Sequence, residues 1–119
     1  MAWNRGEVWQ VNLTPSDGRE MRDPHPAVVV SNNKINFLPY RIIIPITTWR
    51  DNFRGKSFFV KINSNSRNGL NHASAANVLQ VRSVDAQKRF MHKLGELTDN
   101  QMEKIEDALY IVLNLPFIH

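Results

Sequence analysis

Polar and apolar side chains alternate over residues 7–13, which is the two-residue period of a β-strand with one buried face. Residues 14–18 follow with proline, serine, aspartate and glycine, the types that favour a turn. Farther along, the runs 27–30 and 42–44 contain only alanine, valine and isoleucine. We expect these runs to form strands that are buried on both faces and make up the core.

Two further segments, 57–62 and 77–84, complete a series of about five short strands that are separated by polar loops. Helical periodicity is absent until late in the chain. Short strands at this spacing are typical of a small barrel. The sequence therefore predicts a mainly β fold.

The C-terminal segment is the one with clear helix signals. Thr98 is followed three residues later by Gln101, which is a capping-box pattern, and Asp99 lies in the first turn, where the helix dipole favours negative charge. The apolar residues that then share one helical face are Met102, Ile105, Leu109 and Val112. We expect this helix to cover the barrel.

A length of 119 residues suits one compact domain, 1–119. No apolar run approaches the roughly 20 residues that cross a bilayer, and the N-terminus lacks the pattern of a signal peptide, so we expect a cytoplasmic protein without a membrane span. The chain contains no cysteine, which excludes disulfides, thiolate metal sites and cysteine nucleophiles.

Histidine is the remaining residue type that often binds metals. The four histidines are far apart in the sequence, and no carboxylate recurs at a fixed offset from them; they are His25, His72, His92 and His119. The familiar catalytic strings, such as the P-loop, HExxH and GxSxG, are also absent. We therefore predict chemistry without a metal or an organic cofactor.

Charge is distributed unevenly along the chain. Residues 1–95 carry a formal charge of +8 and residues 96–119 carry −4, which gives +4 in total. A basic surface attracts polyanions such as nucleic acid. An acidic protein partner, or a solvated basic face without a specific role, would explain the same charge.

Short strings in a fixed order cover nearly the whole chain: RGEVW at 5–9, LTP at 13–15, GxE at 18–20, PAVVVSN at 26–32, IPITT at 44–48 and VLQVRS at 78–83. Their order and spacing resemble the MazF/PemK-type toxins of toxin–antitoxin modules. The resemblance implies a small open barrel of the SH3-like kind and a homodimer. It also implies metal-independent cleavage of single-stranded RNA at short motifs, and neutralisation by a cognate antitoxin.

The chain departs from the family pattern at one position of the expected site. The family usually has Arg-Pro ahead of the buried valines, and that arginine is regarded as a catalytic group; this chain has His25 there. The resemblance implies that the second group is a threonine, and Thr47 preserves it. Cleavage by a 2′-hydroxyl needs a base for that hydroxyl, an acid for the leaving 5′-oxygen, and donors or positive charge near the phosphate.

Our hypothesis assigns these tasks to three residues. His25 is the general base or acid, because imidazole exchanges protons near neutral pH. Thr47 donates a hydrogen bond to the phosphate, and Arg22, on the same loop as His25, supplies the positive charge that a guanidinium always carries. The alternative is that His25 marks a weakened or inactive homologue that still binds RNA or antitoxin.

Further residues are candidates for RNA binding: Glu20, Thr48, Trp49, Arg50, Arg54, Gln80 and Arg82. Glu20 would orient the loop or accept a hydrogen bond from a base, although a salt bridge to a neighbouring arginine is equally plausible. Gln80 and Arg82 are two apart on a predicted strand and would share one face, either in the groove or simply exposed. The aromatic and cationic segment 49–56 has a composition that suits base stacking, with antitoxin docking as the alternative.

The main rival to a ribonuclease is a barrel that acts by binding. In that interpretation the protein is a toxin that holds a protein target, similar to the gyrase-poisoning toxin CcdB. A third interpretation is a housekeeping nucleic-acid-binding barrel. The ribonuclease remains the leading prediction.

Overall fold

The computed structural model describes residues 3–15 and 17–116, so His119 lies outside the described residues. The strands are β1 (Glu7–Asn12), β2 (Pro24–Val29), β3 (Tyr40–Thr48), β4 (Phe59–Ile62), β5 (Ser74–Asn77), β6 (Arg82–Asp85) and β7 (Phe90–Glu96). The helices are α1 (Ala86–Arg89) and α2 (Asp99–Val112), and three 3-10 turns are η1 (Asn33–Ile35), η2 (Asp51–Phe53) and η3 (Val78–Gln80).

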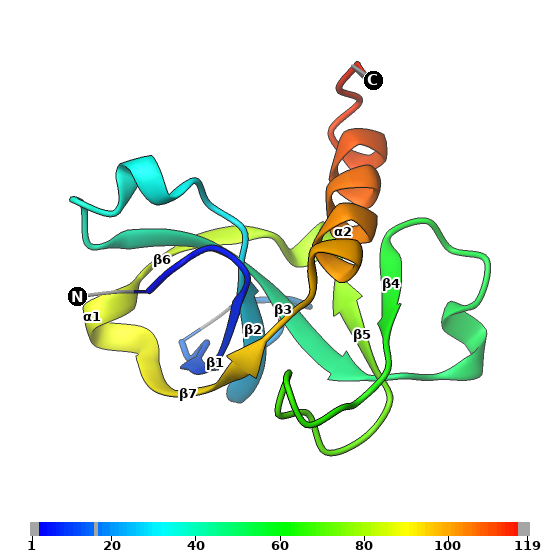
Figure 1. Ribbon diagram of the computed structural model, residues 1–119, viewed down its shortest axis with the longest axis horizontal. Coiled ribbons are helices and arrows are strands. Elements are labelled where there is room, and N and C mark those ends of the chain that lie inside the picture. Colours follow the sequence, from blue (N-terminus) through cyan, green and yellow to red (C-terminus); the bar gives the residue numbers. More distant parts are fainter. Residues whose placement is uncertain (1–2, 16, 117–119) are drawn as a thin grey trace.

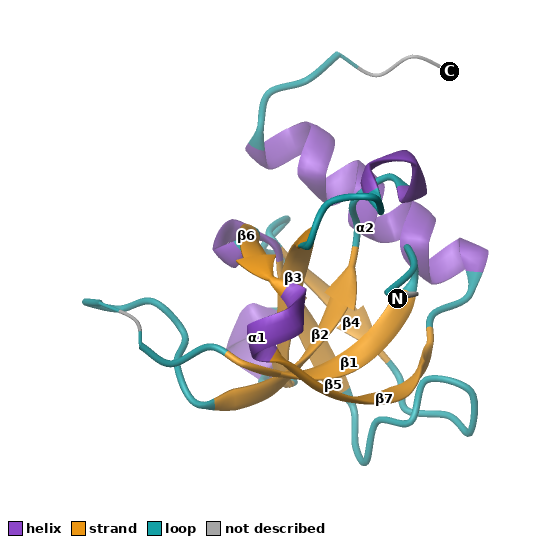
Figure 2. Ribbon diagram, turned by 90° about the vertical axis from the view of Figure 1, so that its left-hand side faces the viewer, coloured by secondary structure: helices purple, strands orange, loops and turns teal. Residues whose placement is uncertain are grey.

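The strands form one curled antiparallel sheet in the order β4-β5-β3-β2-β1-β7, with β6 added on β3 (Figures 1 and 2). The long strand β3 carries the curl, because its middle pairs with β2 while its end pairs with β5. Among the described residues no ladder joins the outer strands β4 and β7, so the barrel is open. The predicted fold class is confirmed.

The two faces of the sheet bury separate apolar clusters. Val28 and Ile44 belong to the cluster beneath α2, whereas Val29 and Ile43 belong to the cluster on the other face. This division explains why the run 27–30 is apolar at every position. The prediction of burial on both faces is confirmed for 27–30, but it is wrong for Ile42, which is 40% exposed. Ile42 lies one step beyond the core on the face of Ile44.

Helix α2 begins as predicted. The Thr98 side chain accepts from the Gln101 backbone N–H, and the Gln101 side chain accepts from the Thr98 N–H, which completes the capping box. Its apolar face packs on the first cluster and so covers one side of the sheet. None of the helices in the described part of the chain has the length and apolar character that crossing a bilayer requires.

The sequence prediction was wrong for 77–84, which is not one strand. Asn77 ends β5, η3 follows, and β6 starts at Arg82. The turn is stabilised by a hydrogen bond from the Val81 N–H to the Val78 carbonyl and by burial of the Val78 side chain. The sequence analysis also missed β7, whose alternation is interrupted by charged and small residues.

Candidate functional site

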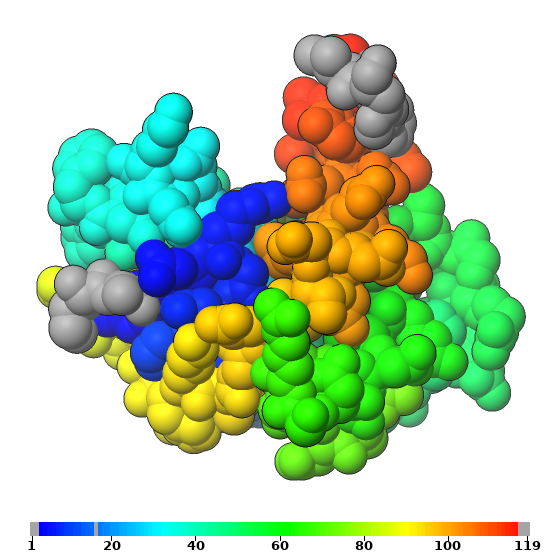
Figure 3. All heavy atoms as spheres, viewed as in Figure 1, coloured from blue at the N-terminus to red at the C-terminus, as the bar shows by residue number. Residues whose placement is uncertain are grey.

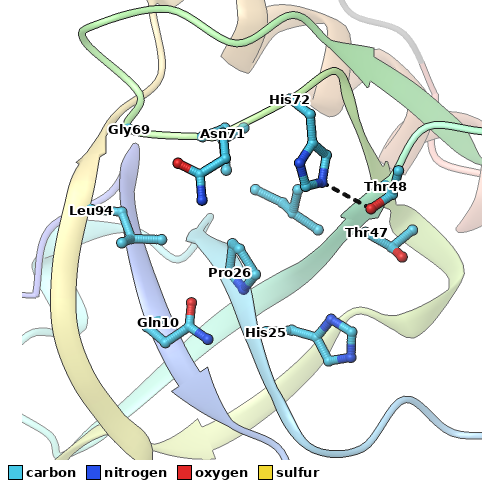
Figure 4. Close-up of a pocket in the computed structure, with 11 residues that line it drawn as sticks. Gln10, His25, Pro26, Thr47, Thr48, Gly69, Asn71, His72 and Leu94 are labelled. Atoms are coloured by element: carbon cyan, nitrogen blue, oxygen red, sulfur yellow. Dashed lines mark hydrogen bonds between the residues drawn. The ribbon is translucent and has the colours of Figure 1, made fainter.

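A pocket of about 340 Å³ lies where β2 and β3 approach loop 63–73 (Figure 4). Its polar lining comes from β1, β2, β3 and the loop: Gln10, His25, Thr47, Thr48, Asn71 and His72. The remaining lining residues are Pro26, Ile46, Gly69, Leu70 and Leu94. The pocket therefore brings together three of the residues predicted from sequence, His25, Thr47 and Thr48.

The register of β2 and β3 explains why His25 and Thr47 share the pocket. Ala27 is paired with Pro45 across the ladder. His25 precedes Ala27 by two residues and Thr47 follows Pro45 by two, so both lie just beyond the last pair of this ladder, and both line the pocket. The two strands separate here, and β3 continues by pairing Thr47 with Ala75 of β5.

Loop 63–73, which completes the pocket, is anchored by a buried asparagine. Asn68 is fully buried, and its Oδ1 accepts hydrogen bonds from the backbone N–H groups of Asn65 and Leu70 at 3.2 and 3.0 Å. Its Nδ2 donates to the carbonyl of Asn63 at 2.9 Å. One side chain thus satisfies three buried or half-buried backbone groups and fixes the shape of the loop.

Two glycines let this loop lie directly on β7. A Cβ at Gly69 would be 2.1 Å from the Leu94 carbonyl oxygen, and one at Gly95 would be 2.1 Å from the Arg67 carbonyl oxygen. Gly69 also has φ +69°, in the left-handed region that favours glycine. The backbone of the loop is therefore held against the sheet immediately before Asn71 and His72.

The second histidine of the pocket contacts a predicted site residue. His72 Nε2 and Thr48 Oγ1 are 2.9 Å apart and hydrogen-bonded, as the dashed line in Figure 4 shows. In that view the His72 ring lies above and the His25 ring below, with both threonines at the same side of the pocket. The hydroxyl can donate or accept, so the contact is compatible with either protonation state of the ring.

Histidines are the only ionisable side chains that line this pocket within the described residues. No Asp or Glu lines it, so nothing there repels a phosphate, and no Lys or Arg supplies a permanent charge. Across residues 3–15 and 17–116, no cluster of three or more metal-ligating side chains is close enough to hold an ion. The polar side-chain groups that line the pocket are thus hydroxyls, amides and imidazoles.

Several predicted residues lie outside the pocket lining. Arg22 is exposed and donates to the Gly18 carbonyl at 3.0 Å, within its own loop 14–23. Glu20 is also exposed in this loop. The expected shared strand face of Gln80 and Arg82 is wrong, because Gln80 ends η3 and its Oε1 accepts from the Met21 N–H at 3.2 Å. Gln80 therefore holds loop 14–23 against the body of the protein.

The aromatic rings of the predicted stacking segment contact one another. Phe53 stacks on Phe59 with centroids 3.8 Å apart and an interplanar angle of 9°, and the edge of Phe53 meets Trp49. Lys61 lies over the Trp49 ring at 5.0 Å. Arg50 and Arg54 are exposed, so this surface offers cations outside a small aromatic cluster rather than open rings.

A second, larger hollow of about 730 Å³ has a different character. It lies between residues 4–7 and the first half of α2, where the blue and orange atoms meet in Figure 3. Its ionisable lining includes five carboxylates and two arginines: Glu7, Glu96, Asp99, Glu103, Glu106, Arg5 and Arg67. This excess of negative charge disfavours a nucleic-acid backbone.

At the edge of this hollow, Glu7 is a well-supported carboxylate. Burial acts to raise its pKa, but hydrogen bonds from the Asn4 backbone N–H, the Trp9 indole and Lys93 outweigh burial and lower the pKa below its usual value. Lys93 donates to both Glu96 and Glu7, which raises the pKa of its ammonium group. These contacts tie β1 to β7.

Sequence reasoning missed three polar residues of the site, Gln10, Asn71 and His72. Gln10 was interpreted as one of the polar positions in an alternating strand. The sequence places His72 among four scattered histidines without metal-ligand spacing, so it gives no sign of a role for this residue. The available signal was the position of Asn-His directly after a glycine and a buried leucine, ahead of a strand.

A family model described as PemK-like, MazF-like toxin of type II toxin–antitoxin system matches residues 4–113. The chain belongs to this family. Endoribonuclease MazF9 of Mycobacterium tuberculosis is 32% identical to it over 117 residues, which cover 93% of this chain and 96% of the relative. The predicted family is confirmed. The predicted enzyme class, an endoribonuclease, is confirmed by the family and by this relative.

Solved structures show the same fold. MazF from Deinococcus radiodurans has a TM-score of 0.79 at 20% identity, covering 96% of this chain and 98% of that one. An endoribonuclease in complex with its cognate antitoxin, from a mycobacterial species, has a TM-score of 0.75 at 26% identity, covering 98% and 100% of the two chains. The barrel with its C-terminal helix is therefore the fold of the family.

Proposed function

We propose that this MazF-like chain, acting as one domain, cleaves single-stranded RNA in the pocket between the β2 and β3 ends and loop 63–73. The 2′-hydroxyl attacks the neighbouring phosphorus, which leaves a 2′,3′-cyclic phosphate and a 5′-hydroxyl end. No metal or organic cofactor takes part. The observation that carries this proposal is that His25 and Thr47 line the same pocket, whose described lining has no carboxylate.

The two residues divide the work by their chemistry. The His25 imidazole exchanges a proton with the reacting oxygens, as base or acid. The Thr47 hydroxyl donates a hydrogen bond to a phosphate oxygen, where negative charge develops. Substitution of the family arginine by histidine thus changes a permanent cation into a group that transfers protons.

The surrounding basic surface holds the rest of the RNA strand. Arg22, Arg50 and Arg54 are exposed and contribute attraction for the phosphate backbone at longer range. Glu20, Thr48, Trp49, Gln80 and Arg82 are the further proposed contacts. Because Arg22 does not line the pocket, we assign it to backbone attraction, whereas the sequence-based hypothesis placed it at the reacting phosphate.

Partners are proposed from the family and from the surface. The complex of a related endoribonuclease with its cognate antitoxin supports an antitoxin as the partner of this chain. The formal charge of +8 over residues 1–95 favours an acidic one. Apolar side chains exposed on β3, η3 and α2 support a homodimer: Tyr40, Ile42, Leu79 and Ile111. An mRNA substrate places the action of the protein in the cytoplasm.

The test is incubation of the purified protein with a long single-stranded RNA in EDTA, followed by mapping of the cut ends. Discrete cuts with 5′-hydroxyl ends, lost in His25→Ala and kept in His92→Ala, are the expected result. His92 is a matched control because it is an exposed histidine on β7 outside the pocket lining. Intact RNA with the wild-type protein would contradict the proposal and favour the alternative in which the barrel acts by binding.

A further inference from the structure

We propose that His72 is a second catalytic histidine, the general acid that protonates the leaving 5′-oxygen, while His25 is the general base. This inference rests on the proposed ribonuclease function and deepens it. It adds a residue that the Arg and Thr of the family pattern do not include. The following observations carry it.

Location is the first observation. His72 lines the same pocket as His25, from loop 63–73, which the buried Asn68 and the close approach of Gly69 to β7 hold in place. A proton donor must be held within hydrogen-bond reach of the leaving group, and this anchoring supplies that constraint. His72 is exposed, so substrate can reach its ring.

Chemistry is the second observation. Cleavage by a 2′-hydroxyl needs two proton transfers at different oxygens, and the pocket has two imidazoles and no other ionisable side chain among its described lining residues. Without a lining arginine or lysine, a protonated imidazole is also the positive charge that can lie nearest to the phosphate. One histidine cannot serve both ends of the same displacement at once.

Hydrogen bonding supports this assignment of the two roles. An imidazole that delivers a proton carries an N–H on both nitrogens, and each N–H needs an acceptor. Thr48 Oγ1, 2.9 Å from Nε2, can accept one N–H of a protonated His72, which leaves the Nδ1 proton for the leaving oxygen. Among the described residues no hydrogen bond occupies the His25 ring nitrogens, so they are available to the 2′-hydroxyl.

The step balances in atoms and charge. The 2′-oxygen gives its proton to His25 and forms a bond to phosphorus. The bond between phosphorus and the 5′-oxygen breaks, and that oxygen takes the proton of His72. Both histidines return to their starting forms by proton exchange with water.

The test uses two RNAs that differ at one atom of the mapped cleavage site. One has the natural 5′-oxygen and the other has a bridging sulfur there, which leaves as a thiolate without a proton. We expect the His72→Gln variant to cleave the oxygen substrate about 10²- to 10⁴-fold more slowly than wild type. Its rate on the sulfur substrate should lie within a few-fold of the wild-type rate. His25→Ala should be slow on both substrates.

Controls separate this proposal from its rivals. His92→Gln should match wild type on both RNAs, and circular dichroism of His72→Gln should be unchanged. Wild-type rates for His72→Gln on the oxygen substrate would overturn the proposal, and so would an equal loss on both substrates, which would show that His72 only positions Thr48. Wild-type protein that cleaves neither RNA would overturn the proposed function itself, and this inference with it.

Discussion

Loop 14–23 precedes β2 and loop 63–73 follows β4, and the two loops differ in how they are anchored. Loop 14–23 is rich in charge and mostly exposed, and a hydrogen bond from Met21 to Gln80 links it to the body. Loop 63–73 has one charged residue, Arg67, but it contains a fully buried asparagine and a glycine pressed against β7.

Under the proposed function, this difference teaches that anchoring, not charge, distinguishes the loop to which we assign the chemistry. Exposed charged side chains have many conformations available, so in our proposal those of loop 14–23 attract RNA without fixing any atom of it. Loop 63–73 presents His72 from a backbone that the Asn68 side chain holds by three hydrogen bonds. Variants in the two loops and in the pocket that the second loop completes separate anchoring from charge.

The largest expected effect is on catalysis. His25→Ala should slow RNA cleavage about 10²- to 10⁴-fold, because it removes one of the two proton-transfer groups. Rates under single-turnover conditions with excess protein measure this directly. His25→Arg should also cleave RNA slowly. A faster rate than wild type would show that the site works better with the family arginine and that His25 weakens it.

The anchoring glycine should matter more than its counterpart in the other loop. Gly69→Ala places a Cβ 2.1 Å from the Leu94 carbonyl at φ +69°, and we expect a loss of about 3 kcal/mol or more in the free energy of unfolding. Gly18→Ala has φ +59° but nothing within 4 Å, so strain of about 1 kcal/mol is expected. Urea denaturation compares the two variants. Equal losses would contradict the contrast between the loops.

The buried asparagine gives a second comparison of the same kind. Asn68→Ala leaves two N–H groups and one carbonyl without their partner and should cost about 2–3 kcal/mol. Asn12→Ala removes one exposed hydrogen bond to the Thr14 N–H and should cost less than about 1 kcal/mol. Thermal and urea unfolding report both values, and a cost of less than 1 kcal/mol for Asn68→Ala would show that the loop is not anchored by this residue.

The stability of the contact between β1 and β7, on which loop 63–73 lies, should depend on pH through Glu7. Its pKa is lowered in the folded protein, so its stabilising contribution is present above the usual carboxyl pKa and is lost as the pH falls through the folded value. Glu7→Gln should cost about 1–2 kcal/mol at neutral pH and flatten the loss of stability in acid. Unfolding midpoints measured from pH 7 down to pH 3 test this; an unchanged acid profile would remove Glu7 from the account.

The smallest expected effect is in loop 14–23. Arg22→Ala should change the free energy of unfolding by less than about 0.5 kcal/mol. Cleavage should fall by less than about tenfold, and less at higher salt, because only long-range attraction is lost. A loss as large as that of His25→Ala would place Arg22 at the reacting phosphate.

Sequence patterns predicted features that depend on neighbours in the chain. The capping box at Thr98 depends on residues three apart. His25 and Thr47 were predicted from short strings that resemble the family, and these strings are also local. Gln80 was misplaced because a tertiary contact with Met21 and the burial of Val78 favour a turn over a continuous strand. His72 reaches Thr48 across 24 residues of sequence, and no local pattern encodes that approach.

The most direct test of the central claim, that RNA is cleaved in this pocket, is to locate the bound substrate. The measurement is an NMR titration of the wild-type protein with a single-stranded RNA that has a 2′-deoxy nucleotide at the cleavage site and so cannot react. The account predicts the largest shift changes at His25, Thr47, Thr48, Asn71 and His72, with smaller ones in loop 14–23. Changes confined to loop 14–23 or to 49–56, with the pocket unaffected, would contradict it.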